Sequence, residues 1–377
     1  MSERRFGIGL FGCGYGILDT YWRVMALISL LKELGIPIHL LQTVSSGSAL
    51  GAKLIETNFD EKIMREALIN LIKGGPRVFE EIYELSEDLN SLIEYVSKLE
   101  KGISFLDLAN LQSQLQKVNG LLRLTKQPNI LNHDHLYKLI NEDLKIEPKK
   151  LVHPVTEFQM VTKNETRGRL SVWSARDPEI SGDPEKYIPD IMVSTMSLPP
   201  LFKPKTIMGE LHSDGLTLAL SEFTAGPDRC QTIVLFCSDH LGYVQTEEMV
   251  DRQNLLQRLI TDFHTDIDMR IVDELEDAHE KGYKIFCDNP SSLVNRIGEP
   301  EKISRIPSFL RGQKITKATT QGQDDENLKI ILVTAKNPIP GLTLLGFRRE
   351  SMEKDFISYG EQNFKNTRQF LSEALLA

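Results

Sequence analysis

The pattern of apolar and polar positions near the start of the chain alternates between strand-like and helix-like segments. Residues 6–11 form a short apolar run, which predicts a buried strand, and a glycine-rich turn follows at residues 12–16. Apolar side chains then recur every three or four residues up to Gly35, which predicts a helix that this glycine ends. The run at residues 35–42 predicts a second buried strand. This order predicts two parallel strands joined by a right-handed helical crossover.

Residues from about 58 to 150 follow a helical period instead. Their apolar positions lie three and four residues apart with charged residues between them, which predicts a set of amphipathic helices inserted into the chain. We expect these helices to pack on the sheet or on one another. A lipid-binding face and a mobile lid over a site stay open as alternatives.

After Pro154 the period changes to two. Residues 155–162 and 169–174 alternate between apolar and polar side chains around a polar turn, which predicts an antiparallel hairpin. The continuous apolar runs at residues 232–237 and 329–333 are typical of fully buried central strands.

The segments between these strands complete the predicted organisation. Residues 250–279 read as a long amphipathic helix, and residues 289–327 are polar with several prolines and glycines, which indicates a surface excursion. We therefore expect an α/β fold with a central, mostly parallel sheet. The whole chain, residues 1–377, is predicted to be one domain that contains the helical insertion.

Ser45 stands where the second predicted strand changes into a helix. Small residues and then apolar ones follow it, as at the start of a packed helix. A serine in this setting is typical of a nucleophile elbow, where a sharp turn lifts the hydroxyl clear of the sheet. Gly47 supplies the absent side chain that close contact between strand and helix requires. The segment Thr43–Gly47 is therefore a candidate catalytic turn, although Ser-Ser-Gly also occurs in ordinary loops.

A serine nucleophile also needs donors already in place for the oxyanion. The loop Gly12-Cys13-Gly14 lacks bulky side chains, so its successive N–H groups can turn toward one point. A dinucleotide-binding loop is the alternative. The spacing Gly-x-Gly-x-Gly differs from Gly-x-Gly-x-x-Gly, however, and His39 and Gln42 stand where an acidic residue would end the second strand. The oxyanion role is favoured.

Two residues are candidates for the base that activates the serine. His240 follows a predicted central strand, where a Ser-His-Asp hydrolase would place its histidine. Asp214 is the other candidate, but an Asp-Gly pair such as Asp214-Gly215 is commonly only a turn. The residues by themselves leave both bases open.

In combination these segments resemble the patatin-like phospholipase family. That family carries a glycine-rich oxyanion loop after its first strand, a Gly-x-Ser-x-Gly elbow after its second and an Asp-Gly motif far downstream. Residues 194–204 are similar to the family's serine- and proline-rich stretch before Asp-Gly, and the hairpin turn at 166–169 and the tail at 340–360 also resemble the family. The resemblance covers nearly the whole chain apart from the helical block and the late polar excursion.

The resemblance implies a three-layer α/β/α fold and a lipid acyl hydrolase with a Ser-Asp dyad. It implies that Ser45 is the nucleophile, that Asp214 is the base with no histidine, and that the oxyanion hole is formed by Gly12, Cys13 and Gly14. The substrate would be a phospholipid or another acyl lipid, cleaved through an acyl-enzyme. No metal and no cofactor is implied.

The chain departs from the family pattern at three places. Thr43 replaces the first glycine of the elbow and puts a β-branched side chain where space is short. Cys13 and Tyr15-Gly16 replace the glycine core of the oxyanion loop and its usual Arg or Lys, and Leu216 replaces the second glycine of the Asp-Gly motif. These changes put the oxyanion geometry and the fit of the substrate in doubt.

Two competing hypotheses stay open beside the lipid acyl hydrolase. In the first, the chain is a catalytically weak relative that binds acyl lipids or a protein partner. In the second, it is a triad hydrolase that uses His240 in place of Asp214 as its base. The sequence does not identify a protein partner.

The length, the composition and the net charge of the chain exclude some classes of function. A chain of 377 residues with 41% hydrophobic residues is long enough to bury a large core. Its net charge of −9 and its pI near 5.5 argue against a nucleic-acid binder. The same charge gives no reason to approach an anionic lipid surface, so peripheral membrane contact would need a local basic or apolar face.

The cysteines and the N-terminus bear on the compartment. Cys13, Cys230, Cys237 and Cys287 are widely scattered without a Cys-x-x-Cys pair, which argues against a disulfide framework or a zinc site and favours a reducing compartment. The apolar stretch after residue 5 is too short and too rich in glycine for a signal peptide, and no apolar run approaches the ~18 residues of a membrane span. We expect a cytoplasmic protein, while export without a cleaved signal stays open.

Overall fold

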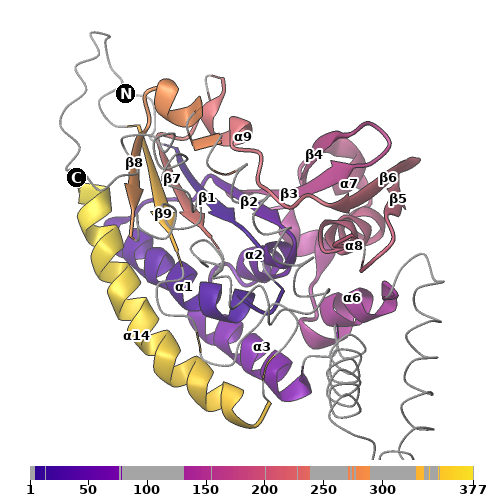
Figure 1. Cartoon of the computed structure of the whole chain (residues 1–377), viewed down its shortest axis with the longest axis horizontal. Helices are drawn as coiled ribbons and strands as arrows, with labels where there is room; N and C mark the ends of the chain where they lie inside the picture. The colour runs from indigo at the N-terminus through magenta and orange to yellow at the C-terminus, as the bar shows by residue number, and fades with distance from the viewer. Residues whose placement is uncertain are drawn as a thin grey trace, which may run out of the picture.

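The computed structural model describes residues 5–12, 14–75, 78, 131–153, 155–199, 201–226, 228–237, 271, 274–275, 277–288, 328–334, 339, 347 and 349–376. At its centre lies a nine-stranded sheet with the order β5-β6-β3-β2-β1-β7-β9-β8, to which β4 is added beside β3 (Figure 1). The pairs that join β3, β2, β1, β7, β9 and β8 are parallel, and those that join β4 and β6 to β3 and β5 to β6 are antiparallel. The strands are β1 (Phe6–Leu10), β2 (Leu40–Val44), β3 (Glu157–Asn164), β4 (Arg169–Ser174), β5 (Lys205–Ile207), β6 (Glu210–Asp214), β7 (Thr232–Phe236), β8 (Lys284–Cys287) and β9 (Lys329–Val333).

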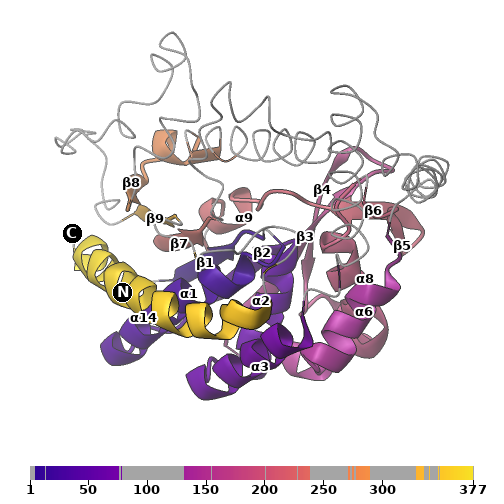
Figure 2. The same ribbon diagram turned by 60° about the horizontal axis from the view of Figure 1, so that its bottom comes forward.

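Helices cover both faces of this sheet. Figure 2 shows α1 (Ile17–Leu34), α2 (Ser46–Glu56), α3 (Glu61–Gly74) and α14 (Arg349–Leu376) below the sheet, and the short α9 (Ser221–Thr224) on its other side. The remaining helical segments are α6 (Asp134–Lys138), the π-helix η2 (Leu139–Asp143), the 3₁₀-helix η3 (Pro148–Leu151), α7 (Pro178–Gly182) and α8 (Pro184–Thr195).

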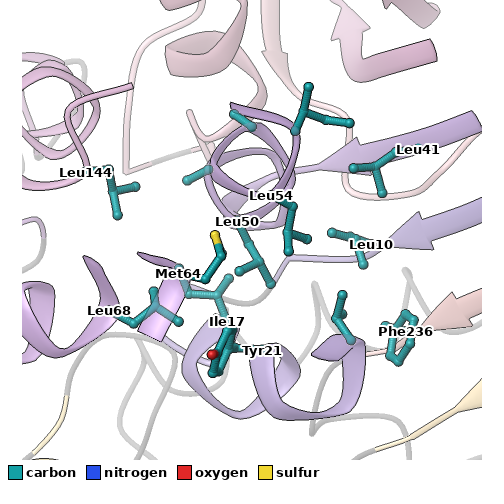
Figure 3. Packing of buried hydrophobic residues seen from close by; sticks show 14 of the residues in the cluster. Leu10, Ile17, Tyr21, Leu41, Leu50, Leu54, Met64, Leu68, Leu144 and Phe236 are labelled. Carbon is teal, nitrogen blue, oxygen red and sulfur yellow. The ribbon is translucent and has the colours of Figure 1, made fainter. Parts of the chain in front are cut away.

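The period of two in the central strands divides the interior into two hydrophobic clusters. In β7, Val234 and Phe236 belong to a first core cluster that contains side chains of α1, α2, α3 and α14 (Figure 3). Ile233 and Leu235 point the other way and belong to a second core cluster, with Leu218 and other residues of the opposite face. Because alternate side chains of a strand face opposite sides of the sheet, two clusters indicate three layers. The predicted three-layer α/β/α architecture is confirmed.

Two glycines in β1 shape the second core cluster. A Cβ atom at Gly7 would lie 2.6 Å from the ring of Phe223, and one at Gly9 would lie 2.6 Å from a methyl group of Leu218. The missing side chains therefore let the segment from Leu218 to Phe223, which follows β6, pack directly on the backbone of β1.

The C-terminal helix α14 is bound to α1 by close packing and by a buried polar cluster. Gly360 faces the indole of Trp22, and a Cβ atom there would overlap its Nε1 atom. Nearby, the buried Asp19 forms an ion pair with Arg23 and accepts a hydrogen bond of 2.8 Å from the amide of Asn363. Since buried charges are costly unless they are paired, this cluster fixes the position of α14 on α1.

The predicted strands and their connections agree with the structure. The strands β1 and β2 are parallel neighbours, and the helix between them ends at Gly35, which has a φ of 65°. The predicted hairpin is the antiparallel pair β3–β4, and the two predicted central strands are β7 and β9. The second strand begins at Leu40, later than the apolar run starts, and Pro37 in that run has no N–H to give to a sheet.

Three predicted segments lie wholly or mostly outside the described residues. Of the helical insertion at 58–150, the structure describes α3, α6, η2, η3 and a few flanking residues. The polar excursion at 289–327 is not among the described residues, and neither is most of the helix predicted at 250–279. The single-domain organisation therefore stays a prediction. Among the helices that are described, none combines the length and the apolar character that crossing a bilayer requires.

We predict that Gly360→Ala destabilises the fold by about 1–3 kcal/mol, because the new methyl group would force α14 away from Trp22. The matched control is Gly182→Ala in α7, where a Cβ atom would meet nothing within 4 Å. Alanine generally favours a helix over glycine, so we expect the control to be neutral or stabilising. Urea unfolding measures the free energy of unfolding of both variants. Equal changes in this free energy would contradict the contact between Gly360 and Trp22.

Candidate active site

Two strands that run in opposite directions end next to each other and bring the candidate residues together. Strand β2 pairs with residues 157–161 of β3, and β4 pairs with residues 159–164, so β2 and β4 occupy opposite edges of β3. Strand β6 pairs with residues 162–164, where β4 already occupies one edge, so β6 shares the other edge with β2. Ser45, directly after β2, therefore meets Asp214, the last residue of β6.

Ser45 has the backbone conformation of a sharp turn. Its φ of 55° and ψ of −140° lie where side-chain-bearing residues are rare, and such strain is typical of functional sites. The turn is held by α2, in which the N–H of Ser48 donates to the carbonyl of Ser45 at 2.9 Å. Gly47 makes the close approach feasible, because a Cβ atom there would lie 2.6 Å from the carbonyl oxygen of Leu10. Ser45 is partly exposed rather than fully enclosed.

Asp214 is buried and receives two hydrogen bonds on its carboxylate. The hydroxyl of Ser45 donates one, and the N–H of Leu216 donates the other at 2.9 Å. Burial raises the pKa of Asp214 to about 7, against the smaller opposing effect of these two hydrogen bonds. Gly215 permits the tight turn that follows, since a Cβ atom there would lie 2.8 Å from the carbonyl oxygen of Val161.

The end of α8 ties both residues to the sheet. The hydroxyl of Thr195 accepts a hydrogen bond of 3.0 Å from the N–H of Ser45 and donates one of 2.6 Å to the carbonyl of Val161. Two residues further on, the carbonyl of Ser197 accepts a hydrogen bond of 3.0 Å from the N–H of Asp214. This is the serine- and proline-rich stretch that the sequence singled out, but the sequence did not indicate which of its atoms matter.

Gln42 anchors the segment that follows Asp214. Its side chain is fully buried on β2, where its Oε1 accepts a hydrogen bond of 2.7 Å from the N–H of Ala219 and its Nε2 donates one of 2.9 Å to Gln159. Gln42, which occupies the position where a dinucleotide-binding fold would have an acidic residue, therefore helps to position the segment after Asp214.

Thr43 fits the elbow because the helix opposite lacks a side chain. A Cβ atom at Gly51 in α2 would lie 2.5 Å from the γ-methyl group of Thr43. The hydroxyl of Thr43 is also paired, at 3.1 Å from the carbonyl of Gln159 and 3.0 Å from the hydroxyl of Ser48. The β-branched side chain that replaces glycine therefore finds both space and hydrogen-bond partners.

Leu216, the other departure near the dyad, is strained. Its φ is 62°, in the left-handed region that favours glycine and that costs other residues about 1–2 kcal/mol. Glycine, the family's usual residue, would adopt this conformation freely.

The predicted oxyanion loop lies against the elbow. A Cβ atom at Gly12 would lie 2.5 Å from the nitrogen of Ser46 and 2.6 Å from the Cβ of Ser45, so the two backbones are in contact. Gly14 has a φ of 54°, and Cys13 lies outside the described residues. The N–H of Ser46, the first residue of α2, was not singled out from the sequence, although the N–H after a nucleophile is a common oxyanion donor.

The alternative base, His240, lies outside the described residues. His212 on β6 lies closer to Asp214 in the chain, but its Nδ1 is 3.0 Å from the hydroxyl of Thr162 and its ring packs edge-on against Trp173. No group of metal-binding side chains occurs in the part of the chain that the structure describes. The three described cysteines are free thiols.

More than half of the chain matches the sequence pattern of a known protein family. A sequence model described as patatin-like phospholipase matches residues 15–219, a range that holds Ser45 and Asp214 but begins after the Gly12–Gly14 loop. Among solved structures, VipD from Legionella pneumophila is similar at 15% identity and a TM-score of 0.32, over 97% of this chain and 67% of VipD. A search of curated protein sequences finds no match.

We predict that Thr195→Val destabilises the fold by about 2–3 kcal/mol, because valine keeps the shape but removes the hydroxyl that accepts from the N–H of Ser45 and donates to the carbonyl of Val161. Thr195→Ser keeps the hydroxyl and is expected to retain most of the stability. The adjacent Ser194 is the matched control, since its buried hydroxyl has no partner among the described residues and Ser194→Ala removes no hydrogen bond. Urea unfolding measures all three, and equal stability of Thr195→Val and Ser194→Ala would contradict the role of Thr195.

Proposed function

The chain belongs to the patatin-like phospholipase family, and from this premise we propose that it is a lipid acyl hydrolase that cleaves fatty acyl esters through an acyl-enzyme on Ser45. The observation that carries the proposal is that Ser45, directly after β2, and the buried Asp214, at the end of β6, converge on one edge of β3. A strained serine beside a carboxyl group whose pKa is about 7 has the chemistry that nucleophilic catalysis requires.

Asp214 acts as the base in the first half of the proposed reaction. The Oγ atom of Ser45 attacks the ester carbonyl carbon and gives its proton to the carboxylate that it already contacts. A base with a pKa near the working pH takes up this proton and then returns it to the departing alcohol. The hydrogen bonds to Leu216 and Ser197 hold Asp214 in place throughout.

The negative charge that develops on the carbonyl oxygen needs donors on the other side of Ser45. We assign this role to the N–H groups of the Gly12-Cys13-Gly14 loop, and add the N–H of Ser46 because it contacts Gly12. The N-terminus of the eleven-residue helix α2 adds a favourable dipole at the same point. Loss of one such donor typically raises the barrier by ~3 kcal/mol.

Hydrolysis of the acyl-enzyme completes the proposed cycle. A water molecule attacks the acyl group on Ser45 while Asp214 accepts its proton, and the proton then returns to Oγ as the acid leaves. The reaction uses no metal and no cofactor. We propose phospholipids or other polar acyl lipids as substrates, on the basis of the family to which the chain belongs.

Covalent labelling with a fluorophosphonate tests the nucleophile directly. We predict that the protein reacts at Ser45, identified by mass spectrometry, and that Ser45→Ala abolishes both labelling and turnover of a soluble acyl ester. Asp214→Asn keeps the shape of the side chain but removes its basicity, so we expect turnover to fall by at least about 1,000-fold. Ser358→Ala, at an exposed position on α14, is the control.

The outcomes separate the competing functions. A triad hydrolase would lose turnover in His240→Ala and keep much of it in Asp214→Asn, the reverse of our expectation. A parent protein that neither reacts with the probe nor hydrolyses short esters would instead favour the weak relative that binds lipids or a partner.

The pH dependence tests the role of Asp214. Since burial raises its pKa to about 7, the carboxyl group holds a proton below that pH and cannot accept one from Ser45. We predict that kcat/KM for a soluble ester rises with pH and reaches half of its maximum near pH 7. An ionisation near pH 4, the ordinary range of an aspartate, would contradict a buried base in this site.

A further inference from the structure

Leu216 is the one residue between His212 and Leu220 that is not buried. Its neighbours Thr217 and Leu218 are almost completely enclosed, and Leu218 belongs to the second core cluster. Leu216 itself belongs to neither core cluster and packs against neither of them within the described part of the chain. A half-exposed leucine beside a row of buried residues contributes little to the core.

The turn after Gly215 explains why residue 216 has a positive φ, but it does not explain why that residue is a leucine. The chain must bend sharply after Gly215 so that the following segment can pack on Gly7 and Gly9 of β1, and this bend requires a positive φ. Glycine or asparagine would meet that requirement with less strain than leucine. A residue that is unfavourable for the turn and absent from both core clusters of the described residues suggests a role in binding.

Leu216 lies directly beside the catalytic dyad that we propose. Its N–H donates to the carboxylate of Asp214, and the same carboxylate accepts the hydroxyl of Ser45. The backbone of Leu216 is therefore bonded directly to the carboxylate of the dyad, which places this residue next to the candidate site. A partly exposed apolar side chain beside the dyad can contact the acyl group of a bound ester.

We propose that Leu216 is a specificity-determining residue that binds the hydrocarbon chain of the acyl ester beside the dyad. This inference rests on the proposed function and adds the substrate preference of the same site. Contact with the leucine favours esters whose acyl chain is long enough to cover it, and acetyl esters gain nothing from it.

The test compares specificity constants for two soluble substrates, p-nitrophenyl acetate and p-nitrophenyl octanoate. We expect the parent to prefer the octanoate, and Leu216→Gly and Leu216→Asn to lower the octanoate-to-acetate ratio of kcat/KM by about fivefold or more. Asparagine is close to leucine in shape and tolerates a positive φ. The Leu216→Asn variant therefore shows whether the apolar character of the side chain, rather than its size, sets the preference for the octanoate. Leu211→Asn, at an exposed leucine on β6, is the matched control and is expected to leave the ratio within about twofold.

Thermal unfolding of Leu216→Gly provides a second readout. Glycine makes the unfolded chain more flexible, which lowers stability, but it also relieves the backbone strain at this position. We therefore expect the Tm of Leu216→Gly to be no more than about 2 °C below that of the parent. A clear fall would mean that the side chain stabilises the fold, and would overturn the inference.

Each kinetic outcome is decisive. An unchanged ratio in both Leu216 variants, with an active parent, would overturn the assignment of Leu216 and leave the proposed function standing. A parent that hydrolyses neither ester would overturn both together.

Discussion

A carboxyl group buried beside a serine hydroxyl is the constraint around which the rest of this structure is organised. Asp214 has lost nearly all contact with water, and burial holds its pKa near 7, far above that of an exposed aspartate. Such a group is tolerated only where neighbouring donors compensate, and the hydroxyl of Ser45 and the N–H of Leu216 do so. The loss of hydration destabilises the folded state, but it also raises the pKa of the carboxyl group and so gives it the basicity that the proposed reaction needs.

Strand β3 and the end of α8 convert this local pair into a rigid unit. Ser45 follows β2 and Asp214 ends β6, 169 positions further along the chain, yet both strands end on one edge of β3. Thr195 and Ser197 then hold the backbone of each residue from the same short segment. The geometry of the dyad therefore depends on one strand register and one helix end, rather than on flexible loops.

Much of the architecture could be predicted from residue patterns, because the features concerned are local. The period of two around the β3–β4 hairpin, the glycine that ends α1 and the continuous apolar runs of β7 and β9 depend on neighbouring residues only. The family resemblance then selected Ser45 and Asp214. Without it, the choice between Asp214 and His240 stayed open, since an Asp-Gly pair is also an ordinary turn.

The contacts that could not be predicted join residues that are distant in the sequence. The role of Thr195 depends on the N–H of Ser45, and the fit of Thr43 depends on the missing side chain of Gly51. The buried position of Gln42 likewise depends on Ala219, far downstream. No periodicity in the sequence indicates such long-range contacts, because each of these residues occurs in many local settings. The contact exists only once the fold brings the two residues together.

The polar cluster between α1 and α14 has a consequence for synthesis of the chain on the ribosome. Asp19 lies in the first helix to be made, and its amide partner Asn363 is separated from it by 344 positions. Until that late residue emerges, the ion pair of Asp19 and Arg23 lacks its amide partner, and the indole of Trp22 lacks its packing against Gly360. The contact between α1 and α14 can therefore form only after translation is almost finished.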